Sequence, residues 1–308
     1  AKILKHTSLS DLAMKVANCV RCGKCKITCP VFYPDENMFY HPRNKNIALG
    51  SLIEVMLYIA QRTHSTAFNV LKNLEEIADH CTLCHKCALK CPVQIDTADI
   101  SISERNLLTD RKFKKTALAT KTILKYLGTQ KKSANLILRQ TLLKFGSTAQ
   151  RSFNRVAGIL PDSAKTSQNF ILDMVRSPVS KPHAFELTKL IPGADRNQVV
   201  LINPEQKPLK SVFYFPGCGS ERIFTQISMA SIYLLLSNQI RVILPPSYTC
   251  CGYPFKVNSK TMEYDRILLE NLLVFSQIKA MFQDLEFDAC LVSCGTCMES
   301  LQTQGLDE

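Results

Sequence analysis

Eight of the fourteen cysteines in this 308-residue chain fall into two runs of identical spacing. Each run reads Cys-x2-Cys-x2-Cys-x3-Cys-Pro; the first extends from Cys19 to Pro30 and the second from Cys81 to Pro92. Three thiolates three residues apart can wrap a short loop around one metal centre, and the closing proline restricts the cysteine before it to extended backbone. The repeated spacing therefore predicts two metal centres of similar construction.

This spacing is the signature of bacterial ferredoxins, in which the fourth cysteine of each run ligates the cluster of the other run. We predict two cubane 4Fe-4S clusters, the first held by Cys19, Cys22, Cys25 and Cys91, and the second by Cys81, Cys84, Cys87 and Cys29. The crossed ligands would join residues 19–92 into one unit. Basic side chains in the runs would raise the reduction potentials if they lie near the clusters, and a solvated loop is the alternative. They are Arg21, Lys24, Lys26, His85, Lys86 and Lys90.

Zinc sites and disulfides are the other interpretations of these cysteines. Zinc motifs usually bring together two Cys-x2-Cys pairs separated by a loop, which is not the pattern seen here. Disulfides are disfavoured because the chain shows no secretory leader and is large enough to build its own core. No segment approaches about 18 uninterrupted apolar residues, so we expect no transmembrane helix.

Length and composition predict two or three domains, since 46% of the residues are hydrophobic. We expect an α+β multidomain fold with an α-helical dicluster ferredoxin domain over residues 1–110. A basic helical segment with a proline-rich linker would follow over 111–210, and a small α/β domain with parallel strands over 211–308. In the first domain, apolar periodicity predicts helices that lead into Cys19 and Cys81 and a further helix over 51–62.

The net charge of +12 comes from residues 111–161, which contain twelve Lys or Arg and no Asp or Glu. Two amphipathic helices are predicted here, ended by Gly128 and Gly146, with residues such as Leu124 and Ile137 facing inward. The basic face is interpreted either as solvated surface or as a docking surface for an acidic partner or an anionic membrane. Nucleic acid is disfavoured because no nucleic-acid-binding motif accompanies the charge.

The last hundred residues alternate between strand and helix patterns. Strands are predicted over 211–215, 241–244 and 289–293, with helices near 222–238 and 259–283, which favours a parallel α/β sheet. Cysteines follow each strand: Cys218, then Cys250-Cys251-Gly252, then Cys294-x2-Cys297. The carboxyl ends of parallel strands share one edge, where open α/β folds bind ligands.

Cys250 and Cys251 are adjacent, and neighbouring side chains on extended backbone point in opposite directions. The pair therefore suits different metal atoms of a cluster better than one shared ion. A zinc site and reduced cysteines in a packed core are the alternatives. Cys290 lies inside the third predicted strand and is expected to be a small buried apolar residue.

The order Cys218, Cys250-Cys251-Gly252, Cys294-x2-Cys297 resembles the cysteine-rich CCG domain of heterodisulfide reductases and related iron–sulfur oxidoreductases. Together with two ferredoxin motifs it resembles the iron–sulfur subunits of glycolate oxidase, lactate-utilisation proteins and anaerobic glycerol-3-phosphate dehydrogenase, over residues 8–108 and 211–301. The resemblance implies a third, non-cubane cluster ligated by Cys218, Cys250, Cys251, Cys294 and Cys297. Such proteins usually carry two CCG repeats, and this chain begins with Ala1, so we expect a fragment of a longer polypeptide with an FAD-linked oxidase domain upstream.

The resemblance also implies electron transfer from a flavin that has oxidised a 2-hydroxy acid such as glycolate or lactate, through the two cubanes, to a quinone or another acceptor. No G-x-G-x-x-G, P-loop, H-E-x-x-H or G-x-S-x-G motif is present, so FAD is expected on a partner domain or subunit, and no catalytic residue is assigned. The alternatives are a disulfide reductase acting at the CCG cysteines and a metal-stabilised interaction protein. We expect a cytoplasmic protein, with peripheral contact at the inner face of the membrane as a variant.

Overall fold

The computed structural model describes residues 8–32, 38–65, 68–157, 185–194 and 197–303. By contacts the chain divides into an N-terminal unit, residues 1–117 with 254–261, and a C-terminal unit, residues 118–253 with 262–308. The predicted domain boundaries at residues 110 and 210 stay predictions, because a division by contacts does not show which parts fold independently. Within the described residues, no helix combines the length and apolar character needed to cross a bilayer.

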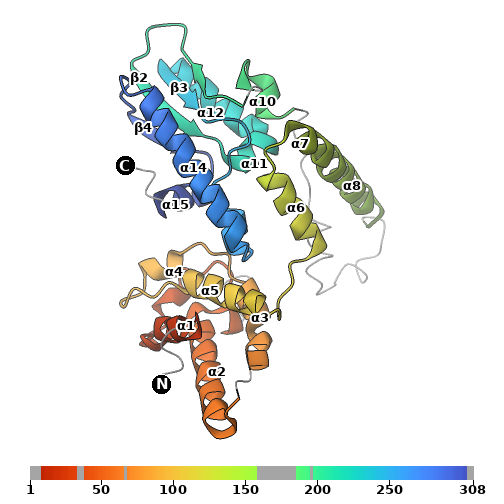
Figure 1. Cartoon of the computed structure of the whole chain (residues 1–308), viewed down its shortest axis with the longest axis vertical. Coiled ribbons are helices and arrows are strands. Elements are labelled where there is room, and N and C mark those ends of the chain that lie inside the picture. Colours follow the sequence, from red (N-terminus) through yellow and green to blue (C-terminus); the bar gives the residue numbers. More distant parts are fainter. Residues whose placement is uncertain (1–7, 33–37, 66–67, 158–184, 195–196, 304–308) are drawn as a thin grey trace. The chain divides into compact units, whose positions relative to one another are not determined.

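Five α-helices and three short 3₁₀ segments make up most of the described N-terminal unit. The helices are α1 (Ser8–Ala17), α2 (Pro42–Thr63), α3 (Glu75–Asp79), α4 (Lys86–Leu89) and α5 (Thr97–Asp110), and the 3₁₀ segments are Lys24–Lys26, Met38–Tyr40 and Phe68–Leu74. The helices α1, α2 and α5 enclose an apolar core that includes Leu12, Leu49, Met56 and Leu108 (Figure 1). The mainly helical first domain predicted from the sequence is therefore confirmed.

Helix α2 begins nine residues earlier than the predicted start at residue 51. Pro42 occupies the first turn of α2, where a backbone N–H has no partner within the helix, so proline loses no hydrogen bond there. The His41 ring accepts a hydrogen bond from the Arg43 N–H at 3.0 Å. The prediction was wrong because it relied on the apolar stripe, whereas the cap lies upstream of that stripe. This longer helix brings its first turn to the cysteine runs.

A four-stranded sheet forms the centre of the C-terminal unit, in the order β1-β3-β2-β4. Strands β2 (Lys210–Phe215), β3 (Ile240–Leu244) and β4 (Ala289–Val292) are parallel, as predicted. Strand β1 (Val200–Ile202) pairs antiparallel with β3 and lies within the stretch predicted to be an irregular linker. Most of that linker lies outside the described residues.

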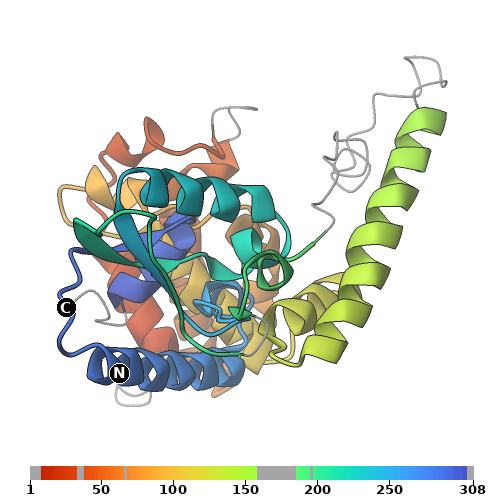
Figure 2. The same cartoon turned by 90° about the horizontal axis from the view of Figure 1, so that it is seen from above.

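Helices cover both faces of this sheet, because successive side chains of a strand point to opposite faces. Val212 and Tyr214 pack with Ile232 of α12 (Thr225–Ser237). Phe213 and Phe215 contact Phe275 of α14 (Thr261–Met281) with ring centroids 5.3 and 6.1 Å apart. Figure 2 shows helices on both sides of the strands, with α14 as the long blue ribbon on one of them. The remaining short helices of this unit are α10 (Leu187–Leu190), α11 (Gly217–Arg222) and α15 (Gly295–Thr303), whereas α13 (Tyr253–Val257) belongs mostly to the N-terminal unit.

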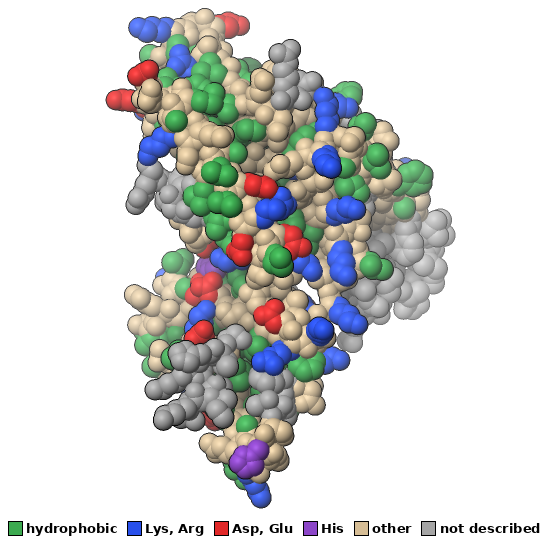
Figure 3. Space-filling view, viewed as in Figure 1, with side chains coloured by type: hydrophobic (Ala, Val, Ile, Leu, Met, Phe, Trp, Pro, Cys, Tyr) green, Lys and Arg blue, Asp and Glu red, His purple; other side chains and the backbone are tan. Residues whose placement is uncertain are grey.

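The basic segment forms α6 (Leu118–Gly128), α7 (Lys132–Leu138), a π-helical stretch (Arg139–Phe145) and α8 (Gly146–Ala157). The predicted end at Gly128 is confirmed, whereas Gly146 begins α8 and ends no helix, because the chain continues through the π-helical stretch. Leu124 is buried as predicted, but Ile137 is exposed. Figure 3 shows Lys and Arg side chains along the edge where Figure 1 places α6, which carries the exposed Lys121 and Lys125.

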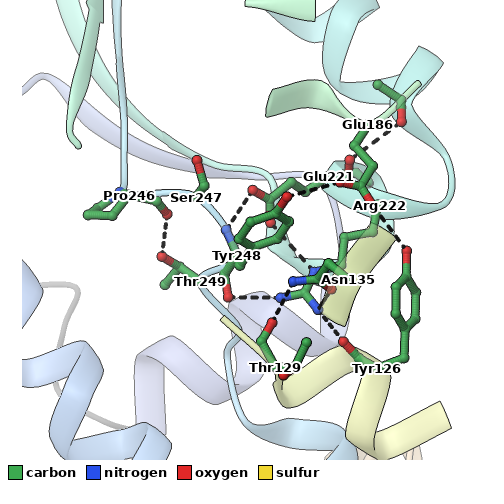
Figure 4. A network of polar contacts seen from close by, with 12 residues as sticks. Tyr126, Thr129, Asn135, Glu186, Glu221, Arg222, Pro246, Ser247, Tyr248 and Thr249 are labelled. Atoms are coloured by element: carbon green, nitrogen blue, oxygen red, sulfur yellow. Dashed lines mark hydrogen bonds and ion pairs between the residues drawn. The ribbon is translucent and has the colours of Figure 1, made fainter. Parts of the chain in front are cut away.

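Arg222 of α11 attaches the basic segment to the cysteine-rich part of the C-terminal unit (Figure 4). Its side chain is fully buried and donates to the Tyr126 carbonyl of α6, to Asn135 Oδ1 of α7 at 3.1 Å and to the Tyr248 carbonyl at 2.9 Å. Each of these acceptors is thereby satisfied inside the protein. The segment is therefore packed on one side, in addition to its exposed basic side.

Candidate metal centres

The first cysteine run lines a cavity together with one cysteine of the second run. The four residues are Cys19, Cys22, Cys25 and Cys91. Arg43, Asn46 and Thr97 complete the wall. This grouping is the one expected for the first cluster, and ligation of iron by these residues stays a prediction.

A second cavity takes three cysteines from the second run and one from the first. They are Cys29, Cys81, Cys84 and Cys87. Pro42, Lys45 and Thr97 also line it. Thr97, which receives a 3.2 Å hydrogen bond from Asn46 Nδ2, therefore lies in the walls of both cavities, and the first turn of α2 contributes to both.

The two runs adopt the same loop conformation. Arg21 and Gly23 of the first run have φ of 57° and 75°, and the corresponding Leu83 and His85 of the second have 54° and 55°. Left-handed backbone is uncommon for residues other than glycine and is concentrated at functional sites. The repeated spacing thus produces a repeated turn that brings three cysteines to one cavity.

The residues around the cavities fit thiolate-bound iron–sulfur clusters. Burial raises the pKa of the Cys25 thiol to about 11, and burial likewise raises the pKa of Cys87, so both thiols must release protons when metal binds. The backbone N–H of Arg43 bonds to Cys25, and the backbone N–H and hydroxyl of Thr97 bond to Cys87, and each of these bonds opposes the rise in pKa. Donors of this kind also tune the reduction potential of a cluster.

Two buried charged residues of α5 lie near the second run. Arg105 donates to the carbonyls of Ala78 and Cys81 at 2.7 and 2.9 Å, which holds the start of the run against α5. Burial raises the pKa of Glu104 to about 8, although Lys45 and Arg105 oppose this effect. Sequence reasoning missed both residues, because nothing in the pattern of α5 distinguishes them from exposed charges.

Glu104→Gln is expected to make stability less dependent on pH. Because the folded-state pKa of Glu104 lies above its usual value of 4.5, the folded chain binds more protons than the unfolded chain between these values. The free energy of unfolding therefore falls as the pH rises from about 5 to about 8, and the variant lacks this contribution. Thermal midpoints measured across that range test the difference, with the exposed Glu54→Gln as control. Equal slopes for wild type and Glu104→Gln would contradict it.

The third set of cysteines lies after the carboxyl ends of the three parallel strands, as predicted. The thiols are in contact in the order Cys218, Cys250, Cys251, Cys297, Cys294. The first four are buried and Cys294 is exposed. Asn271 Nδ2 bonds to the Cys250 carbonyl at 3.0 Å and Ser300 Oγ to the Cys251 carbonyl at 2.7 Å, so helices α14 and α15 hold the adjacent pair.

Two expectations about individual cysteines were wrong. The thiols of Cys250 and Cys251 contact each other and do not point apart, because the pair lies beyond the end of β3 and not in a strand. Cys290 is exposed, because β4 is the edge strand of the described sheet and its first three residues are exposed. None of the fourteen cysteines, all of which are described, forms a disulfide.

The thiols of this third set differ in acidity. The contact with Cys218 lowers the pKa of Cys250, but the contact with Cys251 and burial outweigh it and leave this pKa raised to about 12. The pKa of Cys294 is lowered, because hydrogen bonds from Thr296 and the Cys297 N–H outweigh the opposing effect of burial. Without metal, the exposed end of the set is thus the more reactive end.

Gly217→Ala is expected to disrupt the third set. Gly217 has φ of 69°, and a Cβ atom there would lie 2.7 Å from Cys297 Sγ. The left-handed conformation alone costs alanine about 1–2 kcal/mol, and the clash must displace a thiol as well. We expect a lower free energy of unfolding and less metal bound at this set. Gly219→Ala is the control, since nothing lies within 4 Å of its added Cβ; equal effects of the two changes would contradict the prediction.

Comparison with known proteins agrees with both parts of the chain. Residues 15–95 match a family of 4Fe-4S dicluster domains, and residues 212–302 match a family described as a cysteine-rich domain. The chain is 20% identical over 292 residues to a probable glycolate oxidase iron–sulfur subunit of Bacillus subtilis, covering 92% of this chain and 57% of that protein. It is 33% identical over 103 residues to an Hdr-like menaquinol oxidoreductase iron–sulfur subunit 2 of Archaeoglobus fulgidus, covering 30% and 18%.

The chain thus spans less than two thirds of the length of these relatives. No solved structure matches it. The two cavities lie in the part matched by the dicluster model, and the third cysteine set lies in the part matched by the cysteine-rich model. The resemblance predicted from the motifs is confirmed: the chain combines a 4Fe-4S dicluster domain with a cysteine-rich CCG domain.

Proposed function

We propose that this chain is the iron–sulfur electron-transfer component of a flavin-dependent oxidoreductase. The observation that carries the proposal is the pair of four-cysteine cavities whose walls share Thr97 and the first turn of α2. Two clusters in these cavities would be close neighbours, which one-electron transfer between them requires. The eight ferredoxin-motif cysteines are the proposed ligands, grouped as predicted from the crossed pattern.

When bound, each cluster supplies a site that takes up and releases one electron. The chain's own residues would hold the thiolates, donate hydrogen bonds to their sulfurs from Arg43 N–H and Thr97, and shield the buried Cys29 and Cys87 from solvent. None of these roles requires a substrate to reach the N-terminal unit. The chain therefore transfers electrons, and the oxidation of substrate takes place on a partner.

We further propose that the electron donor is an FAD-linked dehydrogenase of a 2-hydroxy acid and that the acceptor is a quinone or another carrier. The names of the two relatives, which mention glycolate oxidase and menaquinol oxidoreductase, support these two ends of the path. The exposed lysines of the basic segment support docking on an acidic partner or on the inner face of the membrane, in a cytoplasmic setting.

The cluster content tests the proposal directly. The full chain is purified without oxygen, iron and acid-labile sulfide are measured, and the dithionite-reduced protein is examined by electron paramagnetic resonance. About eight irons per chain fit two cubanes, and about twelve add a cluster at the third set. A flavoprotein dehydrogenase that has been reduced by its hydroxy acid should then reduce the clusters and produce the same resonance signals. Redox-silent zinc, or fewer than about four irons without a signal, would overturn the proposal.

The third cysteine set supports a second candidate, a disulfide reductase acting at a non-cubane cluster. Four of its five thiols are buried in a continuous row that ends at the exposed Cys294, whose pKa is lowered. A disulfide substrate could therefore approach one end of the row. Turnover of a disulfide by the reduced chain, abolished in Cys250→Ser but kept in Cys290→Ser, would favour this function, and absence of turnover in a protein holding about twelve irons would exclude it.

A further inference from the structure

Lys45 is a buried lysine in the wall of the second cavity. It lies in the first turns of α2, the residue is 6% exposed, and it lines the cavity with Cys29, Cys81, Cys84 and Cys87. Lysine is almost never this buried without a partner. Among the described residues, however, its ammonium group has no hydrogen-bond or ion-pair partner. The position therefore suits an anion held inside the cavity.

The charges around Lys45 favour an anion inside the cavity. Burial lowers the pKa of Lys45, and negative charge on the neighbouring Cys81 and Cys29 opposes this effect. Glu104 also attracts it and Arg105 repels it. Glu104 does not approach as an ion-pair partner, and its Oε1 atom is buried without a hydrogen bond. Four thiolates around a cluster would provide the missing negative charge.

We propose that the Lys45 ammonium group is the fixed counter-charge of the cluster held by Cys29, Cys81, Cys84 and Cys87, and that it raises the reduction potential of this cluster. The inference rests on the proposed electron-transfer function. On reduction by a one-electron donor, the ligated cluster gains one electron and one negative charge, and no bond or proton changes place. A buried positive charge nearby stabilises the reduced form more than the oxidised form.

The first cavity has a weaker equivalent. Arg43 lines it from the same turn of α2, but its side chain is partly exposed and its Nε atom donates to Asn44 Oδ1 at 3.1 Å. Lys86 and Lys90 near the second run are exposed as well. Solvent screens charges at such positions, whereas it screens a buried charge much less. Lys45 should therefore raise the reduction potential of the second cluster more than Arg43 raises that of the first. By this effect the second cluster is reduced in preference to the first.

Redox titration of three variants of the full chain tests this inference. Lys45→Met keeps the length of the side chain and removes its charge, Lys45→Arg keeps the charge, and Arg43→Met is the matched change at the first cavity. Iron content and reduction by dithionite are measured first, followed by both midpoint potentials with paramagnetic resonance as readout.

Lys45→Met should lower the midpoint potential of one cluster by at least about 59 mV, which is a tenfold change in the equilibrium constant of a one-electron reduction. Lys45→Arg should keep this potential near its wild-type value. Arg43→Met should lower the potential of the other cluster, and by a smaller amount. Loss of about four irons in Lys45→Met, with retention in Lys45→Arg, would support the same electrostatic role. Two reducible clusters with unchanged potentials in Lys45→Met would overturn the inference and leave electron transfer intact. A wild-type chain without reducible clusters would overturn the proposed function itself.

Discussion

Replacing Cys29 with serine should remove the cluster of the second cysteine run and leave the cluster of the first. Cys29 belongs to the first run by sequence, yet it lines the cavity that also contains Cys81, Cys84 and Cys87. A serine hydroxyl is a poorer ligand for iron than a soft thiolate. The variant should therefore lose about half of the iron bound at the two ferredoxin motifs, about four atoms per chain.

Double variants show which cluster has been lost. If the ligands are crossed, adding Cys81→Ser to Cys29→Ser removes no further iron, whereas adding Cys19→Ser removes the remaining cluster. Non-additivity of this kind identifies residues that act in one site. Iron, acid-labile sulfide and the resonance signal of the reduced protein are measured for each chain. Cys290→Ser, at an exposed position of β4, is the control and should keep all of the iron. The opposite pattern of additivity would show that each run holds its own cluster.

Replacing Arg222 with methionine should destabilise the C-terminal unit far more than replacing an exposed arginine. The guanidinium group is fully buried, and its removal leaves the carbonyl groups of Tyr126 and Tyr248 without their donor. It also removes the nearest positive charge from the buried Glu221, 3.9 Å away, and the contacts with the Tyr126 and Tyr248 rings. Breaking a buried charged network in this way costs about 3–5 kcal/mol.

Urea denaturation of the full chain measures this loss. Arg266→Met is the matched control, because Arg266 forms an exposed pair with Glu270 on α14 and such pairs contribute less than about 1 kcal/mol. Arg222→Lys keeps the charge but not the planar fork of donors, so it should lie between wild type and Arg222→Met. If Arg222→Met and Arg266→Met lost similar free energies, Arg222 would not be the link that holds α6 and α7 on the cysteine-rich part.

Local spacing was enough to predict much of the candidate site. The loop of each run is shaped by residues close together in the sequence, as the matching φ values of Gly23 and His85 illustrate. The same holds for β2, β3 and β4, whose apolar patterns are short and continuous. The start of α2, the role of Gly146 and the exposure of Cys290 could not be predicted in this way. They depend on a cap, on a π-helical stretch and on the place of β4 at a sheet edge, none of which leaves a regular pattern.

The burial of charged residues is the feature that the sequence predicted least well. Nothing in the sequence distinguishes Lys45 from Lys86, but Lys45 is buried in a cavity wall and Lys86 is exposed. Arg222 and Arg266 differ in the same way. Whether a charge is screened or buried decides whether it tunes a cluster, anchors a helix or does neither. Burial is a property of the neighbours that packing brings to a residue.

The sequence alone determined which cysteines form three sets and what chemistry those sets favour, because metal ligation depends on residue type and on spacing within a turn. Tertiary structure alone decided that the first turn of α2 and Thr97 stand between the two cavities, that Lys45 faces one of them, and that Arg222 joins the basic segment to the cysteine-rich part. These features bring together residues far apart in the chain, and they arise only when the helices pack around a shared core.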